Sequence, residues 1–222
     1  KDLTILSVSY KSDHILKKFL TQFNSKFKII LVENSSNIHL KNQLLKKFKN
    51  LDVILSGKNI GFGGAFNLGA KKVKTKYVLH VNPDAKIDLN NILKLYLFLK
   101  KNSQAGIVAP REILSNSKFI NKDSSLKDVN SYNEVDYVRG FVMMLNFNNC
   151  KKTKFFDKNF FLYMEEIDFC IRLKKLGKKI FILNYAIANH LGGQSHNPTY
   201  NFEMELQRNW HYMWSLFYFN KK

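Results

Sequence analysis

Cysteine, proline and arginine are scarce in this chain of 222 residues, which has two cysteines, three prolines and four arginines. The two cysteines, Cys150 and Cys170, are too few for a disulfide framework and lack the spacing of a metal site. No stretch reaches the roughly 18 uninterrupted apolar residues that a membrane-spanning helix needs. We expect no signal peptide, because Lys1 and Asp2 lead directly into a strand-like apolar run. These absences argue against a secreted disulfide-rich domain and a transmembrane segment, and favour a cytoplasmic protein.

Acidic residues are also few: 17 Asp and Glu stand against 36 Lys and Arg, and the formal net charge is +19. Because only four of the basic residues are arginines, lysine dominates the surface. Such a surface attracts polyanions, whether nucleic acid, anionic lipid headgroups or nucleotide substrates. A hydrophobic content of 45% argues against a disordered basic tail and predicts a single globular domain over residues 1–222.

Short apolar runs of β character alternate with amphipathic helical runs through the first hundred residues, which is typical of βαβ units. We therefore predict an α/β fold with a mixed, mainly parallel sheet flanked by helices. The predicted strands are residues 3–9, 27–33, 52–55, 77–81, 105–109, 135–147 and 179–183. The predicted helices are residues 13–23, 40–48, a segment ending near 72, 89–101, 165–176 and 200–219. Residues 118–133 are expected to form a long surface connection.

Polar residues follow three of the predicted parallel strands. Ser9 ends the first strand and Tyr10 follows it, Glu33 ends the second, and Asn82 and Asp84 follow the fourth. Ligands of open parallel sheets bind beyond the carboxyl ends of the strands. There an aromatic ring can stack on a nucleobase, a Glu33 carboxylate can accept an N–H from its edge, and Asp84 suits a hard divalent cation. The alternative for each residue is that it only caps its loop.

A glycine-rich segment, NIGFGGAFNLG at residues 59–69, holds four of the ten glycines. It is not the dinucleotide fingerprint, whose spacing it lacks, and it is not a P-loop, because no Gly-Lys-Ser/Thr follows. Glycines here allow the backbone to approach an anionic ligand at a helix N-terminus. A tight strand-to-helix turn is the alternative.

Three carboxylates, Glu165, Glu166 and Asp168, stand within four positions at the start of a predicted helix. On a helix Glu165 and Asp168 share a face, whereas Glu166 points about 100° away, so we expect different roles. The alternative is that they are acids favoured by the helix dipole, with Asp168 paired to Arg172.

His190 follows a predicted strand and precedes two glycines and a serine. The glycines leave backbone room for a charged group. His190 is therefore a candidate metal ligand beside Asp84.

Seven motifs in order resemble glycosyltransferase family 2, the inverting enzymes of the GT-A (Rossmann-like) fold, and especially its bacterial rhamnosyltransferase-like members. They are SYKS, VENSS, NIGFGGAFNLG, HVNPDA, RGFVMMLN, FFLYMEEIDFCIRLKKLG and HLGGQS, within about residues 3–195. The resemblance implies a nucleotide-sugar-binding half, residues 1–110, and an acceptor-binding half, residues 111–222.

The resemblance also implies roles for single residues. The donor-binding residues would be Ser9, Tyr10, Glu33, Asn59, Gly61, Asn67, Asn82 and Asp84. Asp84 and His190 would hold Mg²⁺ or Mn²⁺. Glu166 falls where such enzymes have the catalytic base, but it replaces the usual Asp, which leaves the base open between Glu165, Glu166 and Asp168. Glu33 likewise replaces an Asp, and Asn82 stands where a full D-x-D motif would have its first acid.

The implied activity is metal-assisted transfer of a sugar, with rhamnose favoured, from a dTDP- or UDP-linked donor to a hydroxyl of a cell-surface or lipid-linked glycan. One rival is a sugar-nucleotide nucleotidyltransferase, which would need more than Lys11 to grip phosphates near the first strand. A second rival is a basic nucleic-acid-binding module. Few arginines and dispersed lysines disfavour it, so we expect no nucleic acid partner.

The last stretch, residues 209–222, is aromatic and ends in two lysines. We expect this helix to pack in the core. The alternative is a peripheral contact with the inner face of the cell membrane, because aromatic and basic segments suit the headgroup zone.

Overall fold

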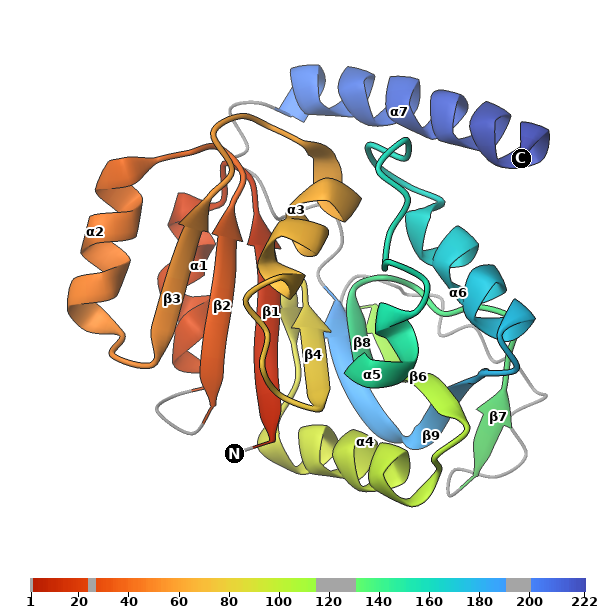
Figure 1. Cartoon of the computed structure of the whole chain (residues 1–222). Coiled ribbons are helices and arrows are strands. Elements are labelled where there is room, and N and C mark those ends of the chain that lie inside the picture. The colour runs from red at the N-terminus through yellow and green to blue at the C-terminus, as the bar shows by residue number, and fades with distance from the viewer. Residues whose placement is uncertain (1, 24–26, 115–130, 191–200) are drawn as a thin grey trace.

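The protein is seen here in a computed structural model that describes residues 2–23, 27–114, 131–190 and 201–222. A nine-stranded sheet stands at its centre, with helices on both faces (Figure 1). The predicted mixed α/β architecture is confirmed. Among the described residues, no helix combines the length and the apolar character needed to cross a membrane.

The elements follow one another as strands and helices in alternation through the first half. The strands are β1 (Leu3–Ser9), β2 (Lys28–Glu33), β3 (Leu51–Leu55), β4 (Tyr77–Val81), β5 (Ala85–Lys86), β6 (Ala105–Leu114), β7 (Tyr132–Glu134), β8 (Val142–Asn146) and β9 (Lys179–His190). The helices are α1 (Asp13–Thr21), α2 (Ile38–Lys47), α3 (Gly61–Ala70), α4 (Leu89–Lys101), α5 (Phe147–Lys151), α6 (Glu165–Lys175) and α7 (Asn201–Lys221).

The strand order is β3-β2-β1-β4-β8-β6-β9-β5, with β7 paired to β9. Strands β3, β2, β1 and β4 are parallel, whereas β8 runs antiparallel to both β4 and β6. After β3 the chain crosses back over β1 to place β4 on its other side, so the order reverses between β1 and β4. The carboxyl ends of these strands therefore open a crevice where a ligand can bind.

Two apolar cores lie on the two faces of the sheet. One contains residues of α1, α2 and α4, and the other contains residues of α3, α5 and α6. In β1, Ile5 belongs to the first core and its neighbour Leu6 to the second, as the two-residue period of a strand requires. Because helices cover both faces of the sheet, side chains on both sides of the parallel strands are buried, and most of them are apolar.

Several predicted boundaries are wrong. Only residues 142–146 of the predicted strand 135–147 are a strand, and the short elements α5 and β5 were not predicted. Strands β6 and β9 run well beyond the predicted ends, to Leu114 and His190, because they pair with each other over this length. Most of the predicted connection 118–133 lies outside the described residues, but its last two residues begin β7.

The C-terminal helix does not pack in the core. α7 lies across the top of the molecule in Figure 1, over the loop before α6, and Ser215 is its buried side chain. The residues of α7 that face this loop make the contacts between the helix and the rest of the protein. The expectation of core packing is therefore wrong.

Candidate active site

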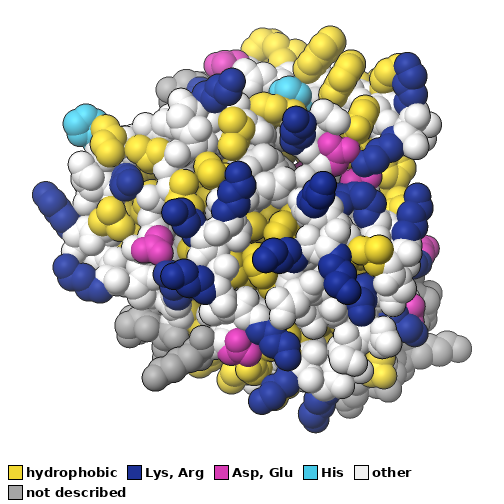
Figure 2. Space-filling model, in the orientation of Figure 1, with side chains coloured by type: hydrophobic (Ala, Val, Ile, Leu, Met, Phe, Trp, Pro, Cys, Tyr) yellow, Lys and Arg dark blue, Asp and Glu magenta, His cyan; other side chains and the backbone are white. Residues whose placement is uncertain are grey.

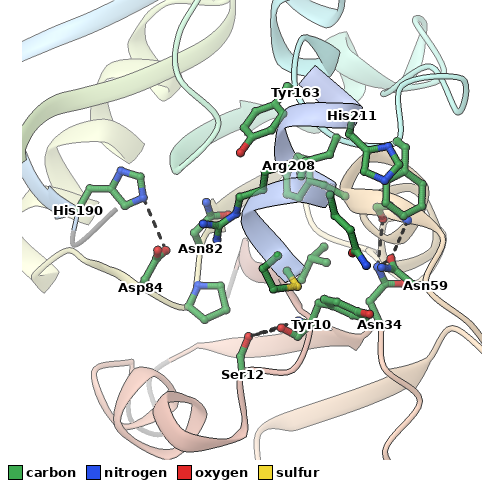
Figure 3. A pocket seen from close by; sticks show the side chains of 18 residues that line it. Tyr10, Ser12, Asn34, Asn59, Asn82, Asp84, Tyr163, His190, Arg208 and His211 are labelled. Atoms are coloured by element: carbon green, nitrogen blue, oxygen red, sulfur yellow. Dashed lines mark hydrogen bonds and ion pairs between the residues drawn. The ribbon is translucent and has the colours of Figure 1, made fainter. Parts of the chain in front are cut away.

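A cavity of about 310 Å³ lies at the carboxyl ends of β1, β2 and β4, and α7 borders it (Figure 3). Six of the residues predicted from sequence line it together, namely Tyr10, Asn59, Gly61, Asn82, Asp84 and His190. They come from four separate segments of the chain. The fold thus gathers residues that are 180 positions apart in sequence around one space.

Asn34 fixes the cavity wall formed by the glycine-rich segment. Its side-chain amide donates to Asn59 Oδ1 at 2.8 Å and to the Gly61 carbonyl at 3.3 Å, and its oxygen accepts the Ile60 N–H. Asn59 Oδ1 also accepts the Gly61 N–H. Asn34 is buried at the end of β2, so this network joins the turn after β2 to the start of α3.

Gly61 has a structural reason to be glycine. Its φ is +74°, and a Cβ at this position would lie 2.2 Å from the carbonyl oxygen of Phe161. The same carbonyl accepts the N–H of Phe62 at 2.9 Å. The loop before α6 therefore packs closely against the N-terminus of α3. A side chain at residue 61 would prevent this packing.

Asp84 and His190 face each other at the edge of the cavity. Asp84 Oδ1 lies 3.6 Å from His190 Nε2, while His190 Nδ1 lies 2.8 Å from Glu112 Oε1. Arg139 donates to the other oxygen of Glu112 at 2.8 Å. The Phe141 ring stacks on His190 with centroids 4.8 Å apart. Acid and base alternate along this row of four side chains.

The charges in this row stabilise one another. Burial alone lowers the pKa of His190, but Asp84 and Glu112 outweigh it and raise that pKa to about 9. Burial would likewise raise the pKa of Glu112, but His190 and Arg139 hold it below its ordinary value. Glu112 could not be predicted from sequence, since the predicted strand ended before Pro110.

His80 supports Asn82 from below the cavity. Its ring is fully buried, with Nδ1 3.0 Å from the Leu6 carbonyl oxygen and Nε2 3.0 Å from Asn82 Oδ1. Burial lowers the pKa of His80 to about 4, so the ring is neutral at physiological pH. The neutral ring thus contacts Asn82 without adding charge.

Three predicted donor-binding residues do not line the cavity. Glu33 is fully buried and accepts the backbone N–H groups of Ser35 and Asn37, so it shapes the turn before α2. Asn67 donates to the Phe156 carbonyl and accepts the Phe156 N–H, which ties α3 to the loop before α6. Ser9 is buried at the end of β1.

The predicted catalytic carboxylates are not among the residues that line the cavity; they stand at the start of α6, close after Tyr163. Tyr163 and Met164, which precede the helix, have φ angles of +69° and +67°, and Tyr163 lines the cavity. Burial, with Glu166 close by, raises the pKa of Glu165 well above its ordinary value. Burial also raises the pKa of Glu166. Both carboxylates have a buried oxygen, Oε2, without a hydrogen-bond partner among the described residues.

Asp168 differs from its two neighbours because it is fully paired. Arg172 Nε donates to one of its oxygens at 2.7 Å, and Lys222 donates to the other at 2.7 Å. The predicted pair with Arg172 is confirmed. Asp168 thus anchors the end of α7 to α6, which leaves Glu165 and Glu166 as the unpaired carboxylates of this cluster.

Sequence analysis missed the contribution of α7. Met204, Gln207, Arg208 and His211 line the cavity from this helix, and Figure 3 shows the Arg208 side chain near Asn82. His211 also stacks on Phe161, with centroids 4.1 Å apart. The available signal was that Arg208 is one of only four arginines in a lysine-rich chain.

Solved glycosyltransferase structures share this fold. The mannosyltransferase PcManGT of Pyrobaculum calidifontis, in complex with GDP-Man and Mn²⁺, matches all of this chain and 64% of its own, with a TM-score of 0.74 and 10% identity. GalNAc-T7 with UDP, GalNAc and Mn²⁺ matches 85% of this chain and 43% of its own, with a TM-score of 0.70 and 12% identity. At these identities the likeness establishes the GT-A fold alone.

Curated relatives are closer in sequence. The rhamnosyltransferase WbbL of Escherichia coli is 28% identical over 239 residues, covering 93% of this chain and 88% of the relative. A low-salt glycan biosynthesis hexosyltransferase of Haloferax volcanii is 25% identical over 193 residues, covering 78% of this chain. This chain spans only 62% of the length of the haloarchaeal protein.

The sequence profile of the family named Glycosyl transferase family 2 matches residues 5–171, which is most of the chain. The matched span runs from within β1 to most of α6, and so includes the ends of β1, β2 and β4 at the cavity. The chain therefore belongs to glycosyl transferase family 2 and is a glycosyltransferase domain.

Proposed function

We propose that this domain transfers a sugar, with inversion, from a nucleotide-diphosphate donor to a hydroxyl of a glycan. The observation that carries the proposal is the set of side chains around one cavity. Asp84 and His190 from the strand ends and Arg208 from α7 line it, and the buried Glu165 and the half-buried Glu166 lie close to Tyr163. A diphosphate needs positive charge and an attacking hydroxyl needs a base, and these groups supply both.

The donor would lie across the strand ends. Tyr10 offers a ring for the nucleobase, the linked amides of Asn34 and Asn59 offer polar edges, and Arg208 offers a fixed positive charge for the diphosphate. We favour a dTDP- or UDP-linked sugar. Rhamnose is the favoured sugar because the E. coli relative that matches most of the chain is a rhamnosyltransferase.

The residues present fit a divalent cation, Mg²⁺ or Mn²⁺. Asp84 Oδ1 is buried and has no hydrogen-bond partner among the described residues, and His190 Nε2 faces it. Glu112 on His190 Nδ1 is the kind of partner that orients a metal-binding imidazole. No cluster of three or more ligating side chains occurs in the described part, so diphosphate oxygens would complete the coordination. When bound, such a cation neutralises charge on the leaving diphosphate.

Glu166 would act as the base. The acceptor oxygen forms a bond to the anomeric carbon from the face opposite the diphosphate, and its proton passes to a Glu166 oxygen. The bond from the anomeric carbon to the phosphate oxygen breaks, and its electron pair leaves with the nucleoside diphosphate. Burial raises the pKa of Glu166, which makes it a stronger base than an exposed carboxylate. Glu165 beside it is the alternative base.

The acceptor would be a cell-surface or lipid-linked glycan, with the protein in peripheral contact with a membrane. The first half of the chain, residues 1–110, would supply most of the donor contacts, and residues 111–222 the acceptor side. Tyr163 and Arg208 also line the cavity, so the second half contributes to the donor side too.

A panel of nucleotide sugars, with Mn²⁺ or with EDTA, tests the proposal. Ligand at about 100 times its Kd stabilises a protein by about 2.7 kcal/mol, which a thermal shift detects. We expect a dTDP- or UDP-linked sugar to raise the unfolding temperature more with Mn²⁺ than with EDTA, and to be turned over slowly by water. The proposal is wrong if no donor of the panel shifts the unfolding temperature, or if Asp84→Asn leaves the shift unchanged.

A further inference from the structure

The outward face of α7 carries a stripe of large apolar side chains. Its members are spaced three or four residues apart and so share one face: Phe202, Leu206, Trp210, Met213, Trp214 and Phe217. Their exposed fractions lie between 50% and 77%. An amphipathic surface helix normally turns such a stripe toward the core. Here the stripe points to solvent, and exposed apolar patches of this kind mark binding surfaces.

The opposite face of α7 holds the helix in this orientation. Ser215 donates its hydroxyl to the Leu162 carbonyl at 2.8 Å, and His211 stacks on Phe161. Near the C-terminal end, Lys222 bonds to both Asp157 and Asp168. Burying the stripe against the protein would require a rotation that breaks these contacts. These contacts therefore keep the apolar stripe facing solvent.

Positive charge gathers near the C-terminal half of the stripe. Lys221 lies over the Phe217 ring at 5.5 Å. The segment 151–160 reaches the same end of the helix, where Asn159 donates to the Tyr218 hydroxyl at 2.9 Å. Lys158, between Asp157 and Asn159 in this segment, is an exposed lysine at that end of the helix. Figure 2 shows apolar side chains along the top of the molecule and many lysine and arginine side chains over the face below.

The acidic residues of α7 itself lie at its other end, and Asp157 and Asp168 at the basic end are paired with Lys222. Glu203 and Glu205 are exposed in the first turns of α7, whereas Trp210, Trp214 and Phe217 lie toward the basic end. Tryptophan favours the headgroup zone of a bilayer, and lysine favours anionic headgroups. A second protein surface would need its own matching apolar face, but an anionic bilayer matches both the aromatic stripe and the lysines.

We propose that the outer face of α7 is a membrane-docking surface that lies in the interfacial plane of an anionic lipid bilayer. Only its functional consequence rests on the proposed function: Arg208 and His211, on the inner face of the same helix, line the cavity. Docking through the outer face places that cavity directly beneath the headgroups. A lipid-linked glycan would be presented there.

Binding to vesicles tests this surface in the full chain. The chain has two tryptophans, and both belong to the stripe, so their fluorescence reports its environment. With vesicles of phosphatidylcholine and phosphatidylglycerol we expect a blue-shifted emission and co-sedimentation that weakens as salt rises. Pure phosphatidylcholine vesicles should bind at least about tenfold more weakly, because the lysines then lose their partners.

The triple variant Leu206→Ser, Met213→Ser, Phe217→Ser removes apolar area and keeps both tryptophans as reporters. We expect its vesicle affinity to fall at least about tenfold. The control is Leu93→Ser, Leu97→Ser on α4, whose side chains are 45% and 50% exposed on a different helix. The control should bind vesicles like the unmodified chain.

Two results would overturn the proposal. One is vesicle binding that is equal in the triple variant and the control. The other is a concentration-dependent dimer in sedimentation velocity that the triple variant abolishes while vesicle binding is absent, since the stripe would then bind a second copy. Donor affinity, measured on the same variants by titration, should stay unchanged. Loss of donor binding in the unmodified chain would instead refute the proposed function.

Discussion

Two groups of carboxylates lie near the cavity, and they differ in their charged partners. Asp84 and Glu112 lie at strand ends, with His190 between them and Arg139 beyond. Glu165 and Glu166 lie side by side at the start of α6, where each has an oxygen without a hydrogen-bond partner among the described residues. The first group forms ion pairs with His190 and Arg139, whereas no ion pair to Glu165 or Glu166 occurs among the described residues.

The comparison shows how one residue type serves two kinds of chemistry. Neighbouring cations hold the pKa of Glu112 down, whereas burial raises the pKa of both Glu165 and Glu166. A carboxylate that stays ionised suits a cation or a cationic partner. One whose proton is held more tightly suits proton transfer near neutral pH. Asp168, three residues on, is paired and therefore belongs with the first kind.

The largest predicted effect is that of Glu166→Gln. An amide of the same shape cannot accept the proton, so kcat at saturating donor should fall by about 10²–10⁴-fold, while the donor Kd stays within a factor of about two. Steady-state kinetics with titration calorimetry measure both quantities. Glu203→Gln, on the exposed first turn of α7, is the matched control and should leave kcat unchanged. Near-normal turnover in Glu166→Gln would move the base to Glu165.

Asp84→Asn should act on the donor and not on proton transfer. Loss of this charge removes a group that would hold the cation, so donor affinity in Mn²⁺ should fall about 10- to 100-fold and lose most of its sensitivity to EDTA. Titration calorimetry with and without EDTA measures this. Asp52→Asn, a surface acid paired with Lys28, is the control. An affinity that still depends on Mn²⁺ in Asp84→Asn would place the cation elsewhere.

The paired group should also make stability depend on pH. In the metal-free protein the pKa of His190 is raised from 6.5 to about 9, so its stabilising charge is fully present below about pH 6.5 and is lost as pH rises through 9. Between these values we expect a loss of about 2 kcal/mol in the free energy of unfolding, allowing for partial exposure. Denaturant melts of His190→Gln should lack this loss, and those of the exposed-site control His39→Gln should retain it.

The smallest effect is predicted for Glu165→Gln. The folded-state pKa of Glu165 is raised, so ionisation of this group costs stability above the unfolded-state pKa of 4.5 and costs none well below it. Removing the charge should raise the unfolding temperature by about 2–4 °C at pH 7 and by little at pH 4. A lower unfolding temperature at pH 7 would show that the carboxylate has a stabilising partner.

Sequence patterns located one wall of the cavity well. Tyr10, Asn82 and Asp84 follow strands that are parallel neighbours, and parallel strands end at a common edge. Polar residues at the ends of these strands were therefore enough to predict that the three side chains lie close together. Glu33 follows a parallel strand too, but its carboxylate turns back to two backbone N–H groups only two and four residues on. Polarity at a strand end does not tell a loop-shaping group from one facing the cavity.

The other wall of the cavity, near His190 and α7, forms through long-range contacts that cannot be predicted from the sequence. Glu112 reaches His190 because β6 continues past Pro110 alongside β9, and a proline normally suggests that a strand ends. Arg208 and His211 line the cavity because α7 turns its apolar stripe outward, opposite to the usual rule. Both departures come from long-range packing that local propensity cannot reveal.

The position of Mn²⁺ in crystals grown with a donor tests the account most directly. Anomalous scattering locates the ion independently of the protein chain. The account predicts one peak within about 2.5 Å of an Asp84 oxygen, with the donor diphosphate beside it and Glu166 on the other side of the sugar. A peak at Glu165 and Glu166, or a donor bound outside the cavity that α7 borders, would contradict it.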